Sequence, residues 1–161
     1  MNDKGKAIHA WWRSELDRDT AQGRRLAAEL RRAGPVEAVS EPSVHELARA
    51  LGTHDAHRLA RLVTLLAEVR AHVPQTLARR LGGAEPALSQ MRFQRLMRAE
   101  GEELILGLRR ALRIAEHRCN VPALGTDLLF WSEKTRITWC FHYFGAEAPD
   151  ETHTAHSEET A

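Results

Sequence analysis

Arginine side chains recur at helical spacing in three segments of the 161-residue chain. On a helix, positions three, four or seven residues apart share a face, so each set would form a row of guanidinium groups about 5–6 Å apart. A guanidinium group donates two parallel hydrogen bonds to a phosphate, so such rows suit a phosphate backbone. The sets are Arg24, Arg25, Arg31 and Arg32; Arg92, Arg95 and Arg98; and Arg109, Arg110 and Arg113.

The net charge of +1 hides an uneven distribution of charge. Residues 146–161 contain five acidic residues and no lysine or arginine, which leaves 23 basic and 17 acidic residues in residues 1–145. All but three of the basic residues are arginines. This composition permits binding to a polyanion. A charged row also arises as the ordinary solvated face of a helix, so composition leaves both interpretations open.

The motifs of enzymes and cofactor-binding proteins are missing from the sequence. It contains no glycine-rich phosphate loop, no nucleophile elbow and no cluster of carboxylates for two magnesium ions. The pairs His117/Cys119 and Cys140/His142 have zinc-ligand chemistry, but residues two apart on a helix point in nearly opposite directions. We therefore expect no catalytic residues, no metal and no cofactor.

The location of the protein is inferred from hydropathy and cysteine content. No apolar run approaches the roughly 20 residues of a membrane helix, and the first residues lack the apolar core of a secretory signal. Two cysteines are too few for a disulfide framework. We expect a cytoplasmic protein without a membrane partner.

Hydrophobic periodicity predicts an all-α fold, a helical bundle in two lobes. Gly82 and Gly83 open the best candidate linker, residues 82–88. The lobes are then residues 1–81 and 89–145, and residues 146–161 form a disordered acidic tail. The expected helices span about 5–17, 20–33, 43–51, 54–73, 89–98, 102–118, 122–131 and 133–144, and residues 35–42 are expected to form a loop. The expected N-caps are Asp19 or Thr20 for the second helix and Ser89 for the fifth, with a Ser43/Glu46 capping box.

Two other functions fit parts of the chain. Residues 43–66 have the order of a helix-turn-helix motif, with His57, Arg58 and Arg61 near the start of the second helix. This would make the protein a transcription regulator that reads one duplex operator. A protein-interaction adaptor, with arginines that are only solvated, is the third possibility.

The order of several short motifs resembles the CasB family, the small subunit of the type I-E CRISPR Cascade complex. The resemblance runs over most of residues 8–145. It rests on Trp12 to Leu16, Gly23 to Leu26 with Leu30 to Ala33, Arg92 to Met97, Leu108 to Ala111, Asp127 to Trp131, and Trp139 with Tyr143 and Phe144. Residues 35–60 and the acidic tail add nothing to it.

The resemblance implies a non-catalytic subunit of the Cascade complex in antiviral defence. Its partners would be the guide RNA, the target and displaced DNA strands, the backbone and large subunits, and a second copy of itself. The motifs place the contacts at Arg24, Arg25, Arg92, Arg95, Arg109 and Arg110, and Lys134 with Arg136 is a further candidate pair.

Overall fold

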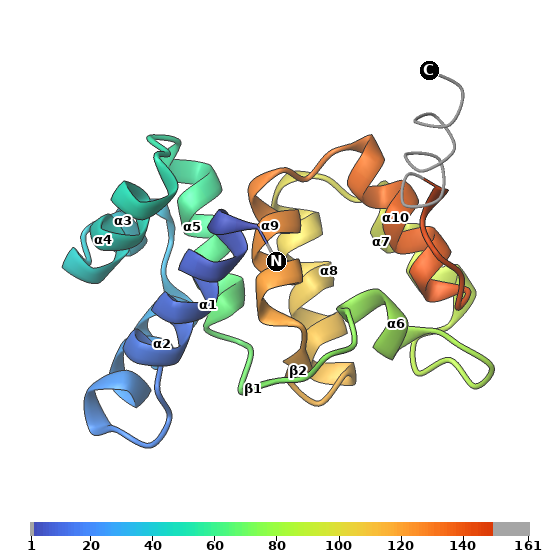
Figure 1. Ribbon diagram of the computed structural model, residues 1–161, viewed down its shortest axis with the longest axis horizontal. Helices are drawn as coiled ribbons and strands as arrows, with labels where there is room; N and C mark the ends of the chain where they lie inside the picture. Colours follow the sequence, from blue (N-terminus) through green and yellow to red (C-terminus); the bar gives the residue numbers. More distant parts are fainter. Residues whose placement is uncertain (1, 150–161) are drawn as a thin grey trace.

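The computed structural model describes residues 2–149, which form ten helices and one two-stranded sheet (Figure 1). The predicted all-α fold is confirmed. The helices are α1 (Asp3–Glu15), α2 (Ala21–Arg32), α3 (Pro35–Val39), α4 (Pro42–Leu51), α5 (Ala56–Leu66), α6 (Leu77–Leu81), α7 (Gln90–Arg98), α8 (Gly101–Ile114), α9 (Val121–Leu129) and α10 (Glu133–Tyr143). The strands are β1 (Ala71–His72) and β2 (Arg118–Cys119), which pair in parallel.

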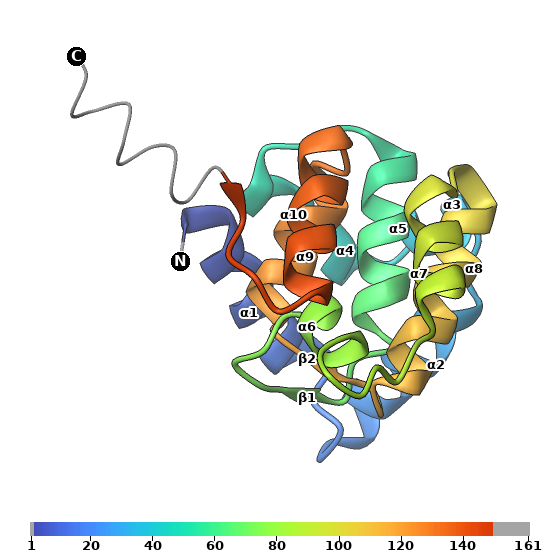
Figure 2. The same ribbon diagram turned by 90° about the vertical axis from the view of Figure 1, so that its right-hand side faces the viewer.

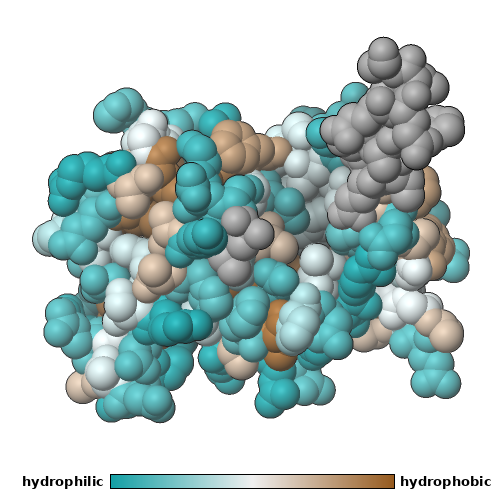
Figure 3. Space-filling view, in the orientation of Figure 1, coloured by the Kyte–Doolittle hydropathy of each residue, from teal (hydrophilic) through white to brown (hydrophobic). Residues whose placement is uncertain are grey.

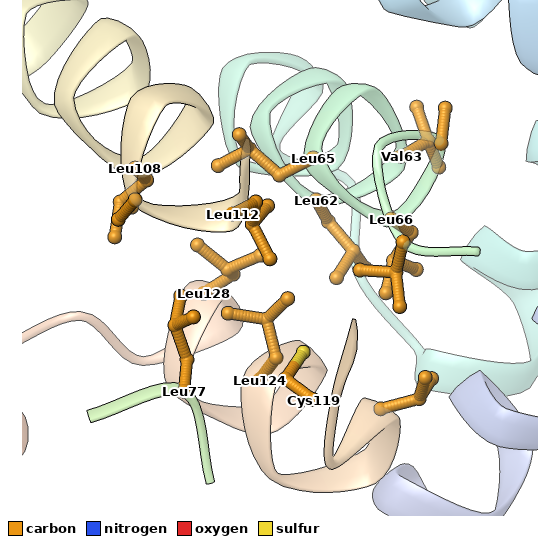
Figure 4. Close-up of a cluster of buried hydrophobic side chains, with 14 of the residues drawn as sticks. Leu62, Val63, Leu65, Leu66, Leu77, Leu108, Leu112, Cys119, Leu124 and Leu128 are labelled. Carbon is orange, nitrogen blue, oxygen red and sulfur yellow. The ribbon is translucent and has the colours of Figure 1, made fainter. Parts of the chain in front are cut away.

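Helix α5 is the centre of the core. Seven of its eleven residues are buried, and it packs against α2, α3, α4, α8 and α9. Its leucines meet Leu108 and Leu112 of α8 and Leu124 and Leu128 of α9 (Figure 4). Because α5 is apolar on most of its circumference, it belongs in the interior of the fold.

The ends of several helices follow the predicted caps. The side chain of Thr20 accepts a hydrogen bond from the Gly23 N–H at 3.0 Å, and that of Ser89 accepts one from the Arg92 N–H at 3.3 Å. The Ser43 capping box is wrong, because Pro42 is the first residue of α4 and the Ser43 hydroxyl is buried without a hydrogen-bond partner among residues 2–149. Proline suits this first position because it has no N–H to satisfy.

Some predicted boundaries differ from the structure because short elements interrupt the periodic pattern. The helix expected to reach residue 73 ends at Leu66, and β1 follows. The helix expected to reach residue 118 ends at Ile114, and β2 follows after Glu116 and His117, both with φ of 60°. The predicted loop at residues 35–42 is wrong in part, because it contains helix α3. Helix α6 lies where no helix is predicted. Each of these helices has five residues, and so short a helix gives too little periodicity to be recognised.

Residues 82–88, the predicted linker, are non-helical and pack against α10. Gly82 lies so close to α10 that a Cβ atom there would be 1.9 Å from the Tyr143 carbonyl oxygen, so glycine is needed. The Tyr143 hydroxyl donates a hydrogen bond to the Leu88 carbonyl. Helix α9 packs on α1 and α5, and α6 packs on α10 and α8, so one core crosses the expected boundary. The division into two lobes stays a prediction.

The structure describes only the first four residues of the predicted acidic tail, residues 146–149. Residues 146–149 contact the body, since Ala148 is 2% exposed and Glu147 pairs with Arg79 at 3.7 Å. The rest of the predicted tail, residues 150–161, lies outside the described residues.

The face seen in Figure 1 is largely polar, with small, scattered apolar patches (Figure 3). None of the helices within residues 2–149 is long and apolar enough to span a membrane.

Candidate nucleic-acid interface

Two adjacent clefts on either side of α8 collect most of the predicted arginines. Groove A, of about 810 Å³, lies between α8 and the pair α2 and α5. Its polar and aromatic lining consists of Arg31, Arg32, Asp55, His57, Arg58, Arg61, Thr64, Glu102, Arg109 and Trp131. Groove B, of about 570 Å³, lies between α7 and α8 and is lined by Arg92, Arg95, Glu103 and Arg110 among apolar residues.

Helix α8 forms the ridge between the grooves. Leu106 lines both of them and is 43% exposed. Figure 2 shows α5, α7 and α8 along one side of the molecule, with α2 below. The grooves therefore form one surface, although their residues come from distant parts of the sequence.

The buried faces of α7 and α8 decide where their arginines point. Phe93 and Leu96 of α7 and Leu108 and Leu112 of α8 are buried in the core. Burial of these side chains turns the intervening arginines outward. Arg109 lines groove A and its neighbour Arg110 lines groove B, because consecutive residues lie about 100° apart around a helix.

The arginines of groove A are largely held by other parts of the protein. Arg109 pairs with Glu68 at 3.3 Å, and both side chains are largely buried, at 27% and 11% exposure. Arg61 donates a hydrogen bond to the Leu128 carbonyl, and Arg58 forms an exposed, 3.9 Å pair with Asp55. No carboxylate of the described residues pairs with Arg31 or Arg32.

The arginines of groove B are free of such partners. Arg92, Arg95 and Arg110 are exposed, and no carboxylate of residues 2–149 lies within 4.0 Å of their guanidinium groups. Glu103 is the one acidic residue that lines this groove within the described chain. Groove B thus presents three cations without a carboxylate partner among residues 2–149, all held by helices.

The other predicted arginines and Lys134 lie outside both grooves. Arg24 donates to the Arg18 carbonyl at 2.8 Å, and Arg25 pairs with Glu29 at 3.2 Å. Arg136 pairs with Glu100 at 3.8 Å. Arg98, Arg113 and Lys134 are exposed.

The structure adds an aromatic wall that the sequence did not predict. Trp131 follows α9, and its ring packs edge-to-face on Trp139, with centroids 5.1 Å apart. Trp139 donates to a carboxylate oxygen of Asp127 at 2.8 Å. Burial raises the pKa of Asp127 to about 6, and the hydrogen bond from Trp139 opposes that rise. The sequence carried no local signal that Trp131 reaches the arginines.

The helix-turn-helix interpretation is contradicted by the burial of α5. Such a motif inserts its second helix into the major groove, which requires an exposed helix face. The first turn of α5 and part of Arg61 are accessible, but Leu59, Leu62, Val63, Leu65 and Leu66 lie in the core. Arg61, predicted to face DNA, donates to α9 instead.

Among the residues considered as zinc ligands, the two histidines have polar partners within the protein and Cys119 lies in the core. Cys119 is fully buried, and burial raises the pKa of its thiol to about 12. The His117 ring lies 2.8 Å from the Glu68 carbonyl oxygen, and that of His142 lies 3.3 Å from the Thr76 hydroxyl.

Comparison with known proteins identifies the family. The search of curated proteins found no significant match. A chain in the crystal structure of E. coli Cascade bound to a PAM-containing dsDNA target shares the fold, with a TM-score of 0.62 and 22% sequence identity over 84% of this chain and 93% of that chain. Residues 26–144 match the family model of the CRISPR-associated protein Cse2. Since this segment exceeds half of the chain, the protein belongs to the Cse2 family, also called CasB, in agreement with the motif resemblance.

Proposed function

We propose that this protein is a non-catalytic subunit of a Cascade complex in CRISPR antiviral defence, and that groove B holds nucleic acid by its backbone. The observation that carries the proposal is the surface of Arg92, Arg95 and Arg110, three exposed guanidinium groups without ion pairs among the described residues. Membership of the Cse2 family supports the assembly, and the E. coli chain with the same fold comes from a complex bound to dsDNA.

The chemistry of groove B favours phosphate over base recognition. Its lining contains arginines and aliphatic side chains, without an aromatic ring or an amide side chain that could read a base. Arginines that neutralise phosphates release counterions, so binding should be independent of sequence and weaken steeply with salt. The bound species would be the guide RNA–target DNA hybrid or the displaced DNA strand.

The other predicted arginines rank by how far they are engaged within the protein. Arg31 and Arg32 at groove A have no carboxylate partner among residues 2–149 and can extend the phosphate surface. Arg98 and Arg113 can extend it along α7 and α8. Arg25 and Arg136 already pair with carboxylates, so we expect smaller contributions from them.

The expected protein partners are the other Cascade subunits and a second copy of this chain. Ile137, Phe141 and Phe144 are 45%, 39% and 60% exposed and recur at helical spacing along and just beyond α10. An exposed apolar row of this kind is typical of a protein contact. It lies outside both grooves, so a neighbouring subunit there would leave groove B open to nucleic acid.

The decisive experiment uses the assembled complex with charge reversal in groove B. The variant R92E/R95E/R110E should weaken binding of a target duplex by at least about tenfold, because each lost phosphate contact removes a favourable electrostatic contribution. Affinity is measured by gel shift, and size-exclusion chromatography checks that the complex assembles.

The matched control reverses three exposed arginines outside both grooves. R13E/R49E/R118E changes the net charge equally on α1, α4 and β2, so it should leave affinity near that of the wild type. If the two triple variants bind equally well, groove B is not the nucleic-acid surface.

A further inference from the structure

Groove A differs from groove B in containing aromatic rings beside its cations. Trp131 and His57 both line it, together with Ile105 and Leu106. Its volume of about 810 Å³ lies in the range of small-molecule sites. A cleft with an aromatic wall and a cationic rim has the chemistry to bind a nucleotide, whose base is flat and apolar and whose phosphate is anionic.

Trp131 is held rigidly enough to act as a stacking platform. Its edge-to-face contact with Trp139 fixes one side, and Asp127 in turn holds Trp139 by a 2.8 Å hydrogen bond. Trp131 is only partly buried, so the remainder of its ring contributes to the wall of the groove. Its Nε1–H is buried and has no hydrogen-bond partner among residues 2–149, so no other group holds the ring from that edge.

The cations of groove A divide between its walls and its rim. Arg61 is held by the Leu128 carbonyl and Arg109 by the Glu68 carboxylate, which offsets its charge, so neither guanidinium group is free to move to a ligand. Arg31 and Arg32, at the end of α2, have no carboxylate partner in the described chain and can reach a phosphate. The acidic residues of the groove, Asp55 and Glu102, are outnumbered by these arginines.

From this arrangement we propose that groove A binds one unstacked nucleotide of a single strand, with its base against Trp131 and its phosphate at Arg31 and Arg32. The proposal rests on the proposed function, since the strand would reach groove A across the α8 ridge from groove B. It adds a base contact to backbone binding. Every base has a flat face, so this contact tolerates any sequence.

The test compares two single strands with equal numbers of phosphates. The full-length protein is titrated at low salt with labelled dT12 and with a twelve-residue abasic strand. We expect dT12 to bind roughly 5- to 150-fold more tightly, the range for stacking of one base on an aromatic side chain. W131L should remove this preference, whereas W131F, which keeps an aromatic ring in the wall of groove A, should retain it.

Tryptophan fluorescence gives a second readout that does not depend on W131L folding. A base stacked on Trp131 should quench wild-type emission when dT12 binds, and the abasic strand should not. W131F should bind dT12 without this quenching. Thymidine 5′-monophosphate should compete only weakly with dT12. If thymidine 5′-monophosphate displaced dT12 at low concentration, groove A would be a site for a free nucleotide, and the proposal would be overturned.

The outcomes separate this inference from the proposed function. Equal binding of both strands by the wild type would overturn the base pocket and leave backbone binding at groove B intact. An unchanged preference in folded W131L, or quenching that persists in W131F, would place the base elsewhere. Binding of neither strand would contradict backbone binding and, with it, the base pocket.

Discussion

Groove A and groove B lie on either side of one helix and use the same residue type in different ways. The guanidinium groups of Arg61 and Arg109 in groove A are bound by a carbonyl and a carboxylate of the protein itself. Those of Arg92, Arg95 and Arg110 in groove B have no such partner among residues 2–149. An arginine-rich helix can therefore serve stability on one face and binding on the next, and the partners of each residue distinguish the two.

The largest expected effect comes from the buried face of α7, the helix that carries Arg92 and Arg95 of groove B. Phe93 is 1% exposed and stacks on Tyr143 with ring centroids 4.0 Å apart. F93D should lower the free energy of unfolding by at least about 4 kcal/mol, because it removes a buried ring and buries an unpaired charge. Urea denaturation measures this. A folded F93D of near-normal stability would show that α7 does not pack as described.

The adjacent residues Arg109 and Arg110 test the comparison within one helix turn. R109E places a second carboxylate beside Glu68 and should cost about 2–3 kcal/mol of stability, less than a fully buried pair because Arg109 is partly exposed. R110E should change stability by no more than about 0.5 kcal/mol.

Charge exchange supplies the control for this pair. The double variant E68R/R109E restores opposite charges and should recover part of the lost stability, as measured by thermal denaturation. Equal stability of R109E and R110E would contradict the assignment of Arg109 to a structural role.

The sequence was sufficient for the parts of this surface that depend on local periodicity. Buried positions such as Leu96 and Leu112 predicted two helices with arginines on the opposite face, and the structure has them. Glu68 is far from Arg109 along the chain, so their pairing depends on tertiary packing that no local pattern encodes. The local sequence around Arg58 and Arg61 predicts a helix-turn-helix motif, because it does not encode the tertiary packing that places both residues in groove A.

The predicted helix boundaries differ from the structure where an element is too short to show a clear hydrophobic period. Pro42 begins α4, and a single proline in a loop-like segment did not distinguish that start from a turn. Local sequence also does not place Trp131 beside the arginines, because that position requires α9 to end next to α8.

A smaller effect is expected from Asp127, which accepts a hydrogen bond from Trp139, the ring that packs on Trp131 of groove A. Burial raises its pKa to about 6, so the folded protein binds this proton more tightly than the unfolded chain does. Its contribution to stability is therefore fully present below about pH 4 and is lost as the pH rises through about 6. The loss should be at most roughly 3 kcal/mol, at about 1.4 kcal/mol for each pH unit between the two pKa values.

Denaturation of the wild type and D127N at several pH values between 4 and 7 isolates this contribution. The variant should lack the decline attributed to Asp127, while contributions from other groups remain in both proteins. Parallel stability profiles would mean that the carboxyl of Asp127 is not held in its protonated form by burial.

The salt dependence of single-strand binding tests the central claim most directly. Each phosphate contact should contribute about −0.7 to the slope of log affinity against log salt concentration. Replacing Arg92, Arg95 and Arg110 by glutamine should therefore make the slope less steep by about 2. R13Q/R49Q/R118Q, with the same loss of charge outside both grooves, should keep the wild-type slope. Equal slopes for the two triple variants would contradict backbone binding in groove B.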